Sequence, residues 1–488
     1  MEEQVRIVKL VLYFIQIVVS KIAGKPISEV IFMAVSDFGG VYIKLIQFVC
    51  LRTNVFSQED KLRFLSFYDN APIEPIDIQA YVTRALGQEK AKQFAFISPT
   101  PFASGTFGQV YRARLMDGSD IVIKVKRPHL VGKLQYDFFV LRVFTKIFTI
   151  LVEQSIIDLN ATLSEFREST YQELDYLQES KNADYFYRTF RGHPRLYIPR
   201  TYLELCTRDI LVQEYVGGVA ATDLIRHNSR YPGIYRQWLQ DHYHTDIFYL
   251  FPTIAYDIAL QGLNQGIFYA DPHPGNIKLL PDNRYAYIDF GIVGTSPTNA
   301  LLYYDLLSAF SKKAVDMDMA KIGRSFLEWG ATDLLEGAHT FDDYFSENRL
   351  SLMQMIVDKY QAILETKRDE FGAFDEEENF SQLCFDIVSS GSLLHVKVPP
   401  AFLTSLKTMI VFKSWVTYLE PHYHFMRVTY QRIIRDVDPK TLARKAKATI
   451  PTPEMSLEAI LEWMESMGES DFAFQRKIDT QLMGHLYV

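Results

Sequence analysis

Three side chains that can offer oxygen to a metal, Asp271, Asn276 and Asp289, lie in the run FYADPHPGNIKLLPDNRYAYIDFG. Asp271 and Asn276 are five positions apart on a loop stiffened by prolines, and Asp289 follows a strand pattern directly. In this order, an aspartate can accept the proton of a hydroxyl, while the asparagine and the second aspartate bind Mg²⁺ between phosphates. Mg²⁺ needs only one or two protein oxygens, because phosphate and water complete its octahedron. Asp and Asn are also common in ordinary turns. The residues that precede them in the chain are therefore needed to distinguish a metal site from plain loops.

A turn with two glycines precedes them in FASGTFGQV, residues 102–110. Glycine lets the backbone approach a polyphosphate closely, because it has no Cβ. The predicted nucleotide-binding residues of this turn are Ala103, Ser104, Gly105, Thr106, Phe107, Gly108 and Val110, with Val110 over the adenine ring. Alone, the turn could be an ordinary hairpin connection.

Lys124 lies in IVIKV, on the strand expected to pair with this turn. Its neighbours are apolar and mostly β-branched, so a solvated lysine is less expected there. An ammonium below a glycine turn can hold α- and β-phosphate oxygens. Turn and lysine together favour a phosphate site.

A buried lysine needs an anion, since an unpaired buried charge costs several kcal/mol. Acidic residues occur in ESTYQELDYLQESKNADYF, where Glu173 and Asp175 are two apart and Glu179 follows Asp175 at i,i+4 spacing. In isolation this run would be a solvated acidic helix face. With Lys124, one of these acids becomes the predicted salt-bridge partner.

The elements that position these residues change character along the chain. Residues 1–95 are predicted to be helical, and a hairpin is predicted over 110–125 around the DGSD turn. Two short strands are expected within 197–218, ending at Gly-Gly, and a further hairpin over 277–292. The remainder reads as mainly helical. The pattern predicts an α+β chain with a small strand-rich lobe, a hinge at about 213–218 and a larger helical lobe.

Composition excludes some classes of function. The chain has 488 residues, is 48% hydrophobic and carries a net charge of −8, with no basic stripe that would bind nucleic acid. Its three cysteines are far apart and form neither a disulfide framework nor a zinc pattern, which fits a reducing compartment. His395, His422 and His424 lack metal-ligand spacing, Met353 and Met355 read as core residues, and His273 reads as structural.

The apolar segment 7–24 is interrupted by Lys9, Gln16 and Lys21. Its uncharged stretch, Leu10 to Ser20, is shorter than the roughly 20 residues that span a bilayer. We therefore expect a helix buried against the protein, with docking at a membrane surface as the alternative. No clear signal peptide or transmembrane helix is expected, and the predicted location is cytoplasmic, with peripheral membrane contact as a second option.

The stretches ASGTFGQVYRARLMDGSDIVIKVKRP, ELDYLQESKNADYF, LVQEYV and FYADPHPGNI…YIDFG resemble the UbiB/AarF family of atypical kinases, which is associated with ubiquinone and other isoprenoid-lipid metabolism. The resemblance runs from about residue 40 to 294, with a weaker echo in LTSLKTMIVFKSWVTYLEP, residues 403–421. It implies a bilobal protein-kinase-like fold that uses ATP or ADP with Mg²⁺. The implied divisions are a helical extension over the active site at 1–95, an N-lobe with an inserted helix at 138–152 within 96–218, and a C-lobe at 219–488.

The resemblance also implies a role for individual residues. Lys124 matches the nucleotide lysine and Glu179 its salt-bridge partner. Asp271 matches the catalytic-loop aspartate, and Asn276 and Asp289 match the Mg²⁺ ligands. Glu173 and Asp175 match the family's E-x-D motif, and QEYV matches the hinge, so the Glu214 carbonyl and the Val216 amide should meet the adenine edge.

Three departures from related patterns stand out. The family's K-x-G-Q motif reads KLIQ from Lys44 to Gln47, and Ile46 cannot adopt all the backbone angles open to glycine. The family's nucleotide loop is alanine-rich, whereas Gly105 and Gly108 stand here, so we expect freer ATP turnover. Ala270 replaces the arginine that often precedes the catalytic aspartate of protein kinases, and no A-P-E motif follows.

These features favour a small or lipidic acceptor, or simple ATP hydrolysis, over a peptide substrate. The leading prediction is an Mg-ATP-dependent atypical kinase or ATPase that supports ubiquinone or other isoprenoid-lipid metabolism, with an isoprenoid lipid or quinone precursor as partner. The alternatives are a small-molecule phosphotransferase and a nucleotide-binding pseudokinase that acts as a lipid-handling scaffold.

Overall fold

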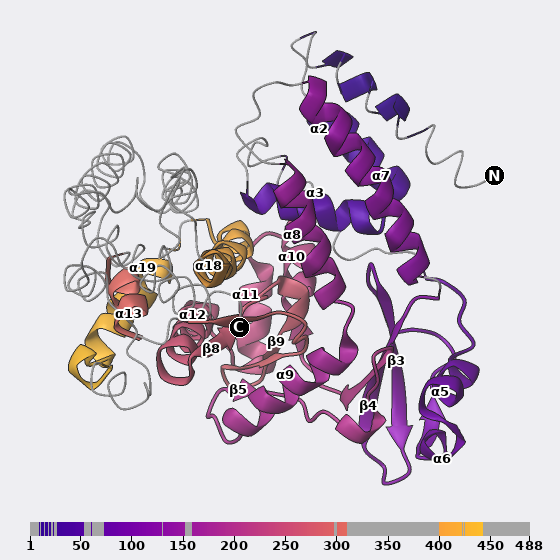
Figure 1. The fold of residues 1–488 in the computed structure, drawn as a ribbon. Coiled ribbons are helices and arrows are strands. Elements are labelled where there is room, and N and C mark those ends of the chain that lie inside the picture. The colour runs from indigo at the N-terminus through magenta and orange to yellow at the C-terminus, as the bar shows by residue number, and fades with distance from the viewer. Residues whose placement is uncertain are drawn as a thin grey trace, which may run out of the picture. The chain divides into compact units, whose positions relative to one another are not determined.

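A computed structural model describes residues 27–52, 73–128, 130–151, 159–296, 300–309 and 400–442 without 422 and 424, together with residue 60 and parts of 9–23. Met353, Met355, His395, His422 and His424 lie outside the described residues. Contacts divide the chain into two compact units: the first holds Met1–His227 and Pro274–Ile292, the second Asn228–His273 and Val293–Val488. The predicted α+β class is confirmed (Figure 1), while the three-part division by residue number stays a prediction.

An antiparallel sheet in the order β1-β3-β4-β6, with β2 paired to β3, forms the strand-rich part of the first unit. Its strands are β1 (Phe94–Ile97), β2 (Ala103–Ser104), β3 (Gly108–Leu115), β4 (Asp120–Lys126) and β6 (Ile210–Glu214). The predicted hairpin is β3–β4, whose register places Val110 opposite Lys124. Alternate side chains, such as Tyr111 and Ile123, enter a core on one face, so Val110 and Lys124 share the other face.

A second sheet in the first unit has the order β5-β10-β9-β7. Its strands are β5 (Leu196–Tyr197), β7 (Val219–Ala220), β9 (Ile277–Leu280) and β10 (Arg284–Tyr287). The β9–β10 pair is the hairpin predicted over 277–292. Asp282 and Asn283 turn it with φ of 62° and 55°, a left-handed conformation that Asp and Asn adopt more readily than most residues.

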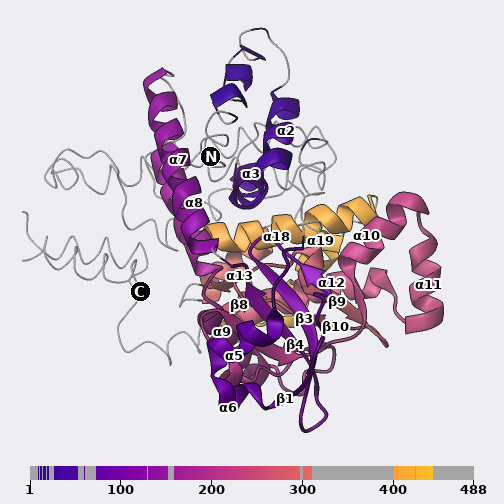
Figure 2. The same ribbon diagram turned by 90° about the vertical axis from the view of Figure 1, so that its right-hand side faces the viewer.

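The helices of the first unit include the N-terminal ones and the inserted pair. They are α2 (Ser28–Phe38), α3 (Val41–Arg52), α5 (Ile78–Leu86), α6 (Gln88–Ala91), α7 (Leu130–Leu151), α8 (Leu159–Gln172) and α9 (Tyr176–Thr189), with short 3₁₀ turns η2 (Leu203–Leu205) and η3 (Pro274–Asn276). The helix predicted at 138–152 is the later part of α7. Phe38 and Tyr42 near the N-terminus form one core with Phe138 of α7 and Phe166 of α8; Figure 2 shows α2 and α3 beside α7 and α8.

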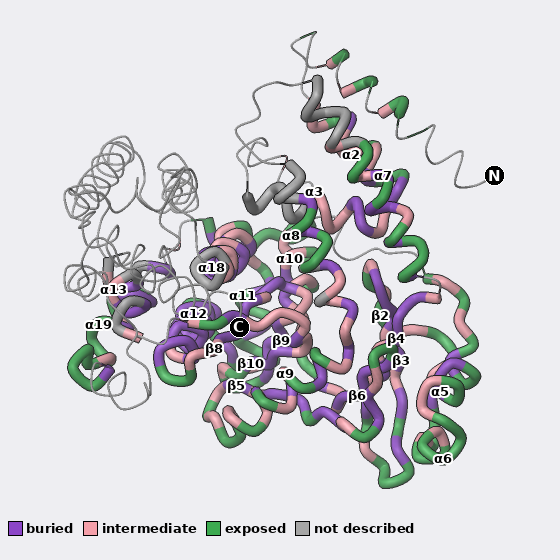
Figure 3. Tube along the Cα trace, viewed as in Figure 1, coloured by how far each residue is buried: buried purple, intermediate pink, exposed green. Residues whose placement is uncertain are grey.

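The second unit is mainly helical. It contains α11 (Ile234–Tyr243), α12 (Ile247–Gln265), α13 (Ala300–Ala309), α18 (Pro400–Leu419) and α19 (Phe425–Asp436), and a two-stranded sheet of β8 (Ile267–Tyr269) and β11 (Val293–Thr295). Helix α10 (Ala221–Arg230) crosses the boundary between the units. Most of α12 is buried, as its purple trace in Figure 3 shows. It leads through Gly266, with φ of 73°, into β8 and the loop of Asp271.

Within the described ranges, no helix is both long and apolar enough to cross a membrane.

Candidate functional site

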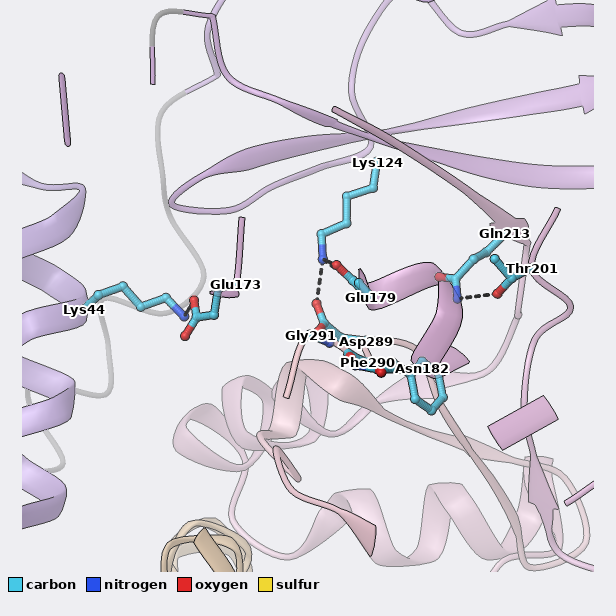
Figure 4. Close-up of polar contacts among 10 residues, drawn as sticks. All are labelled: Lys44, Lys124, Glu173, Glu179, Asn182, Thr201, Gln213, Asp289, Phe290 and Gly291. Atoms are coloured by element: carbon cyan, nitrogen blue, oxygen red, sulfur yellow. Dashed lines mark hydrogen bonds and ion pairs between the residues drawn. The ribbon is translucent and has the colours of Figure 1, made fainter. Parts of the chain in front are cut away.

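Lys124 joins two carboxylates in the first unit (Figure 4). Its Nζ lies 2.9 Å and 3.0 Å from the two carboxylate oxygens of Glu179 and 2.8 Å from Oδ2 of Asp289. The Glu179 side chain is 2% exposed, whereas those of Lys124 and Asp289 are 24% and 30% exposed. The cluster is therefore sealed at Glu179 and open to solvent at the other two side chains.

Helix α9 holds this cluster in place. Asp175 caps its N-terminus by accepting hydrogen bonds from the backbone N–H groups of Leu177 and Gln178. Glu179 follows one turn later and faces the sheet. Of the three acids considered as partners of Lys124, Glu173 and Asp175 precede the helix, and Glu179 lies within it and forms the ion pair.

The same helix also contacts the Asp-Phe-Gly triplet. Asn182 donates from Nδ2 to the carbonyl oxygen of Phe290 at 2.9 Å, and the rings of Phe186 and Phe290 lie 5.3 Å apart. Asn182 was missed in the sequence, although its i+3 spacing from Glu179 places both on one side of the helix. One rigid element therefore orients both Lys124 and Asp289.

The pKa values of Lys124, Glu179 and Asp289 are shifted in different ways by burial and by the neighbouring charges. Burial alone would lower the pKa of Lys124, but the carboxylates of Asp289 and Glu179 raise it well above its ordinary value. Burial raises the pKa of Glu179 to about 7, the nearby charge of Asp289 adds to that rise, and Lys124 opposes it. For Asp289, burial also acts upward, but Lys124 and a smaller effect of Lys44 hold its pKa below the usual range. At neutral pH, Lys124 and Asp289 are ionised, and Glu179 is the member of the three whose pKa lies nearest to neutrality.

We expect Glu179→Gln to gain stability relative to the wild type as the pH rises from 5 to 8. The folded-state pKa of Glu179 lies above its unfolded value of about 4.3. Between these values the folded state keeps a proton that the unfolded state has lost, so the wild type loses stability as the pH rises. Glutamine mimics the protonated acid and does not titrate. The difference should reach roughly 2 kcal/mol.

Urea unfolding of both proteins at pH 5 and pH 8 measures this effect, since other titrating groups largely cancel in the difference. A stability difference that is the same at both pH values would show that Glu179 does not titrate in this range.

The β9–β10 hairpin joins the backbone segments that carry the two predicted Mg²⁺ ligands, Asn276 and Asp289. Asn276 precedes β9 and Asp289 follows β10, and the N–H of Ile288 donates to the carbonyl oxygen of Asn276 at 3.1 Å. Asp289 uses Oδ1 to accept from the N–H of Gly291 at 3.0 Å. The described residues contain no group of three or more His, Cys, Asp or Glu side chains that could hold a metal by themselves. One carboxylate and one amide oxygen nevertheless fit Mg²⁺, which draws its other ligands from phosphate and water.

The side chain of Arg127 holds the glycine turn through hydrogen bonds. Its guanidinium donates to the carbonyl oxygen of Gly105 and to Oγ of Ser104, both at 2.9 Å, and pairs with Glu74 at 3.0 Å. Phe107, at the tip, is 8% exposed and packs into the core that holds the N-terminal helices. Arg127, absent from the sequence prediction, is 7% exposed. The loop conformation is therefore built by buried side chains on both of its sides.

We expect Gly108→Ala to lower the free energy of unfolding by about 1–3 kcal/mol. A Cβ on Gly108 would collide with the Tyr176 hydroxyl and would lie 2.7 Å from the backbone oxygen of Val125, which cannot move without disturbing β4. Thermal or urea unfolding measures the loss.

Gly105→Ala is the matched control, since its Cβ would meet only the oxygen of Gly108 at 3.7 Å. Equal stability losses in the two variants would contradict the steric explanation. Because alanine fits at position 105, its effect on ATP turnover can be measured without a folding defect.

The K-x-I-Q segment lies on α3. Lys44 forms an ion pair of 2.8 Å with Glu173, drawn in Figure 4, and its Nζ lies 5.9 Å from the centroid of the Phe107 ring. Ile46 is 6% exposed and packs against Val35 of α2. A regular helix does not need the backbone freedom of glycine, so Ile46 is accommodated. Gln47 lies on the same helix.

The predicted hinge begins in the last two residues of β6 and continues after the strand. Gln213 is 4% exposed and donates from Nε2 to Oγ1 of Thr201 at 3.2 Å. The Glu214 carboxylate accepts from the Tyr197 hydroxyl at 2.5 Å, and the Lys278 ammonium donates to the carbonyl oxygen of Val216 at 2.9 Å. The contact of Glu214 and Val216 with adenine stays a prediction.

Asp271 follows β8 in the second unit and is partly exposed, while His273 is buried. The proximity of Asp271 to Lys124 therefore stays a prediction.

Comparison with known proteins identifies a family to which the chain is similar. Residues 67–325 match the ABC1 atypical kinase-like domain. A probable protein kinase UbiB of Azotobacter vinelandii is 30% identical over 308 residues, which cover 61% of this chain and 54% of that protein. The chloroplastic protein ACTIVITY OF BC1 COMPLEX KINASE 1 of Arabidopsis thaliana is 27% identical over 417 residues, covering 83% of this chain and 55% of that protein.

An uncharacterized chloroplastic aarF domain-containing protein kinase of Arabidopsis thaliana is 27% identical over 401 residues, covering 80% of this chain and 71% of that protein. For most of these curated relatives the match spans about half of their length.

Proposed function

Because this chain belongs to the ABC1 atypical kinase-like family, which includes the UbiB/AarF kinases, we propose that it binds Mg-ATP and transfers or hydrolyses the γ-phosphate. The observation that carries this proposal is the bridge from Lys124 to both Glu179 and Asp289. In kinases, a strand lysine paired with a helix glutamate binds the nucleotide phosphates, and the Asp-Phe-Gly aspartate binds the metal. The three groups lie on three separate elements, β4, α9 and the segment after β10.

Each residue has a defined task in this proposal. Lys124 holds α- and β-phosphate oxygens while Glu179 keeps its ammonium in place. The turn from Ala103 to Gly108 covers the phosphates, and Val110 covers the base. Asp289 and Asn276 would hold Mg²⁺, which neutralises phosphate charge when bound.

Asp271 acts as the proton acceptor. The oxygen of an acceptor hydroxyl forms a bond to the γ-phosphorus while the bond from that phosphorus to the bridging β,γ-oxygen breaks. ADP leaves with the bridging oxygen and the electron pair of the broken bond, and the hydroxyl proton passes to Asp271. With water as acceptor, the product is inorganic phosphate.

A small or lipidic acceptor is favoured over a peptide. Ala270 stands in place of an arginine that would bind a phosphorylated activation loop, and the sequence carries no A-P-E motif after Asp289. The similarity to a UbiB protein supports a role in ubiquinone or related isoprenoid-lipid metabolism. A small-molecule phosphotransferase and a pseudokinase scaffold are the alternatives, and the experiment separates catalysis from the scaffold role.

The test is phosphate release from Mg-ATP by the full chain, with and without a quinol-like headgroup or isoprenoid lipid, beside Asp271→Asn. We expect turnover by the wild type, stimulation by the lipid and at least a hundredfold loss of kcat in the variant. Mg-ATP binding seen as thermal stabilisation, with no phosphate release under any condition, would replace catalysis by a pseudokinase role. Absence of both binding and release would refute the proposal.

A further inference from the structure

Helix α18 contacts the backbone on both sides of Asp271. Thr408 Oγ1 lies 3.0 Å from the carbonyl oxygen of Ala270, and the indole Nε1 of Trp415 donates to the carbonyl oxygen of Pro272 at 2.9 Å. The two helix residues are seven positions apart, so they lie on one face of α18, two turns from each other. Both are buried, Thr408 at 0% and Trp415 at 2% exposure. All four residues belong to the second unit.

These contacts restrain the backbone on either side of Asp271. The carbonyl of Ala270 belongs to the peptide plane that enters Asp271, and the carbonyl of Pro272 belongs to the plane that follows Pro272. The two hydrogen bonds therefore anchor the backbone one residue before and one residue after Asp271. Proline at 272 has no N–H to donate, so its backbone can be anchored by a hydrogen bond only through its carbonyl oxygen. Gln261 of α12 adds an anchor before the loop, since its Oε1 accepts from the N–H of Tyr269 at 2.9 Å.

The indole of Trp415 is itself held in one orientation. The centroid of its ring lies 5.3 Å from that of Phe251 on α12 and 5.1 Å from that of Phe412, and both pairs are edge-to-face. The Thr408 hydroxyl is also 2.7 Å from the carbonyl oxygen of Thr404 in its own helix, so its one proton is shared between two acceptors. Trp415 is therefore the stronger of the two anchors.

We propose that Thr408 and Trp415 are positioning residues for Asp271, which makes α18 a part of the catalytic apparatus. This inference rests on the proposed role of Asp271 as proton acceptor. Helix α18 lies outside residues 67–325, which match the family domain, and no role follows for Thr408 or Trp415 from that match. The hydrogen bonds hold the aspartate at its place toward an acceptor hydroxyl, where a displacement of about 1 Å can cost a hundredfold in rate.

Trp415→Phe and Thr408→Val test the proposal in the full chain. Each variant keeps most of the side-chain volume and removes the donor. We expect kcat for Mg-ATP turnover to fall tenfold to a hundredfold in Trp415→Phe and severalfold in Thr408→Val. The nucleotide dissociation constant should stay within twofold of the wild type. Amide hydrogen exchange in a peptide covering 268–276 should accelerate in both variants, a readout that does not depend on turnover.

Matched controls come from the same unit. Thr429→Val removes a buried hydroxyl that lies 3.4 Å from the carbonyl oxygen of Pro252 on α12, and Trp238→Phe changes a 40% exposed indole on α11. Both should leave kcat and exchange at 268–276 unchanged.

Faster exchange at 268–276 in a protein that shows no turnover would refute the proposed activity but support the positioning of the loop. A lower unfolding midpoint without a change in exchange or kcat would overturn the inference, because it would assign Thr408 and Trp415 to stability alone.

Discussion

Lys124→Met is expected to abolish Mg-ATP binding and to destabilise the first unit. Methionine keeps the length of the apolar stem but removes the ammonium that bridges Glu179 and Asp289. The two carboxylates then repel each other, and Glu179, which is 2% exposed, has no cation to offset its burial. Nucleotide affinity should fall by at least two orders of magnitude, because the phosphates lose their principal cation.

The free energy of unfolding should fall less in Lys124→Met than is usual when one partner of a buried ion pair is removed. Removing one partner of a buried ion pair costs about 3–5 kcal/mol. Glu179 can take up a proton near pH 7, and Asp289 remains 30% exposed to water, so we expect a smaller loss of about 1–3 kcal/mol at pH 7. Because protonation of Glu179 offsets the missing cation, the loss should shrink as the pH falls.

Calorimetric titration with Mg-ATP and urea unfolding measure the two effects of Lys124→Met. Lys92→Met, which removes an exposed lysine paired with Glu89 within the first unit, is the control and should change neither quantity. Wild-type affinity in Lys124→Met would place the nucleotide elsewhere.

Asp289→Asn should reduce turnover by at least a thousandfold while leaving the fold intact. The amide oxygen can still accept from the N–H of Gly291, so the local turn is kept. Lys124 retains its pair with Glu179, and the charge of Asp289 no longer raises the pKa of that glutamate. What is lost is the anionic oxygen that would bind Mg²⁺, and metal charge neutralisation contributes several kcal/mol to phosphoryl transfer.

The discriminating measurement for Asp289→Asn is nucleotide affinity with and without Mg²⁺. In the wild type, Mg²⁺ should strengthen ATP binding, and in the variant this dependence should be largely lost. Asp209→Asn, at a 60% exposed carboxylate paired with Lys126, should retain it. If Asp289→Asn keeps both turnover and its dependence on Mg²⁺, Asp289 is not a metal ligand.

Local patterns in the sequence were sufficient for the elements that carry the site. Alternating side chains predicted the β3–β4 hairpin, and its register in the structure pairs Val110 with Lys124. The later hairpin was predicted over 277–292, and in the structure Asn276 precedes its first strand and Asp289 follows its second. Both depend on residues close together in the chain, where the period of the strand and the chemistry of the turn act directly. The order of these motifs also identified the family.

Asp175 shows where a local signal was available but was read differently. Asp at the N-cap followed by Gln178 three positions later is a pattern that starts a helix. The structure begins α9 directly after Asp175, so that of Glu173, Asp175 and Glu179 only Glu179 lies on the helix, where it pairs with Lys124. Recognition of the cap in the sequence would have separated Glu179 from the other two acids.

The sequence by itself determined which residues could do chemistry and on which short elements they lie, because periodicity, turn residues and motif order are local properties of the chain. Only the tertiary structure decided which other side chains position these residues. Arg127 donates to the carbonyl oxygen of Gly105, and Asn182 donates to that of Phe290. Thr408 and Trp415 donate to the carbonyl oxygens on either side of Asp271. These contacts join residues from 22 to 143 positions apart. No period or spacing encodes such a pairing, because it arises only when separate elements pack and their buried polar groups must find partners.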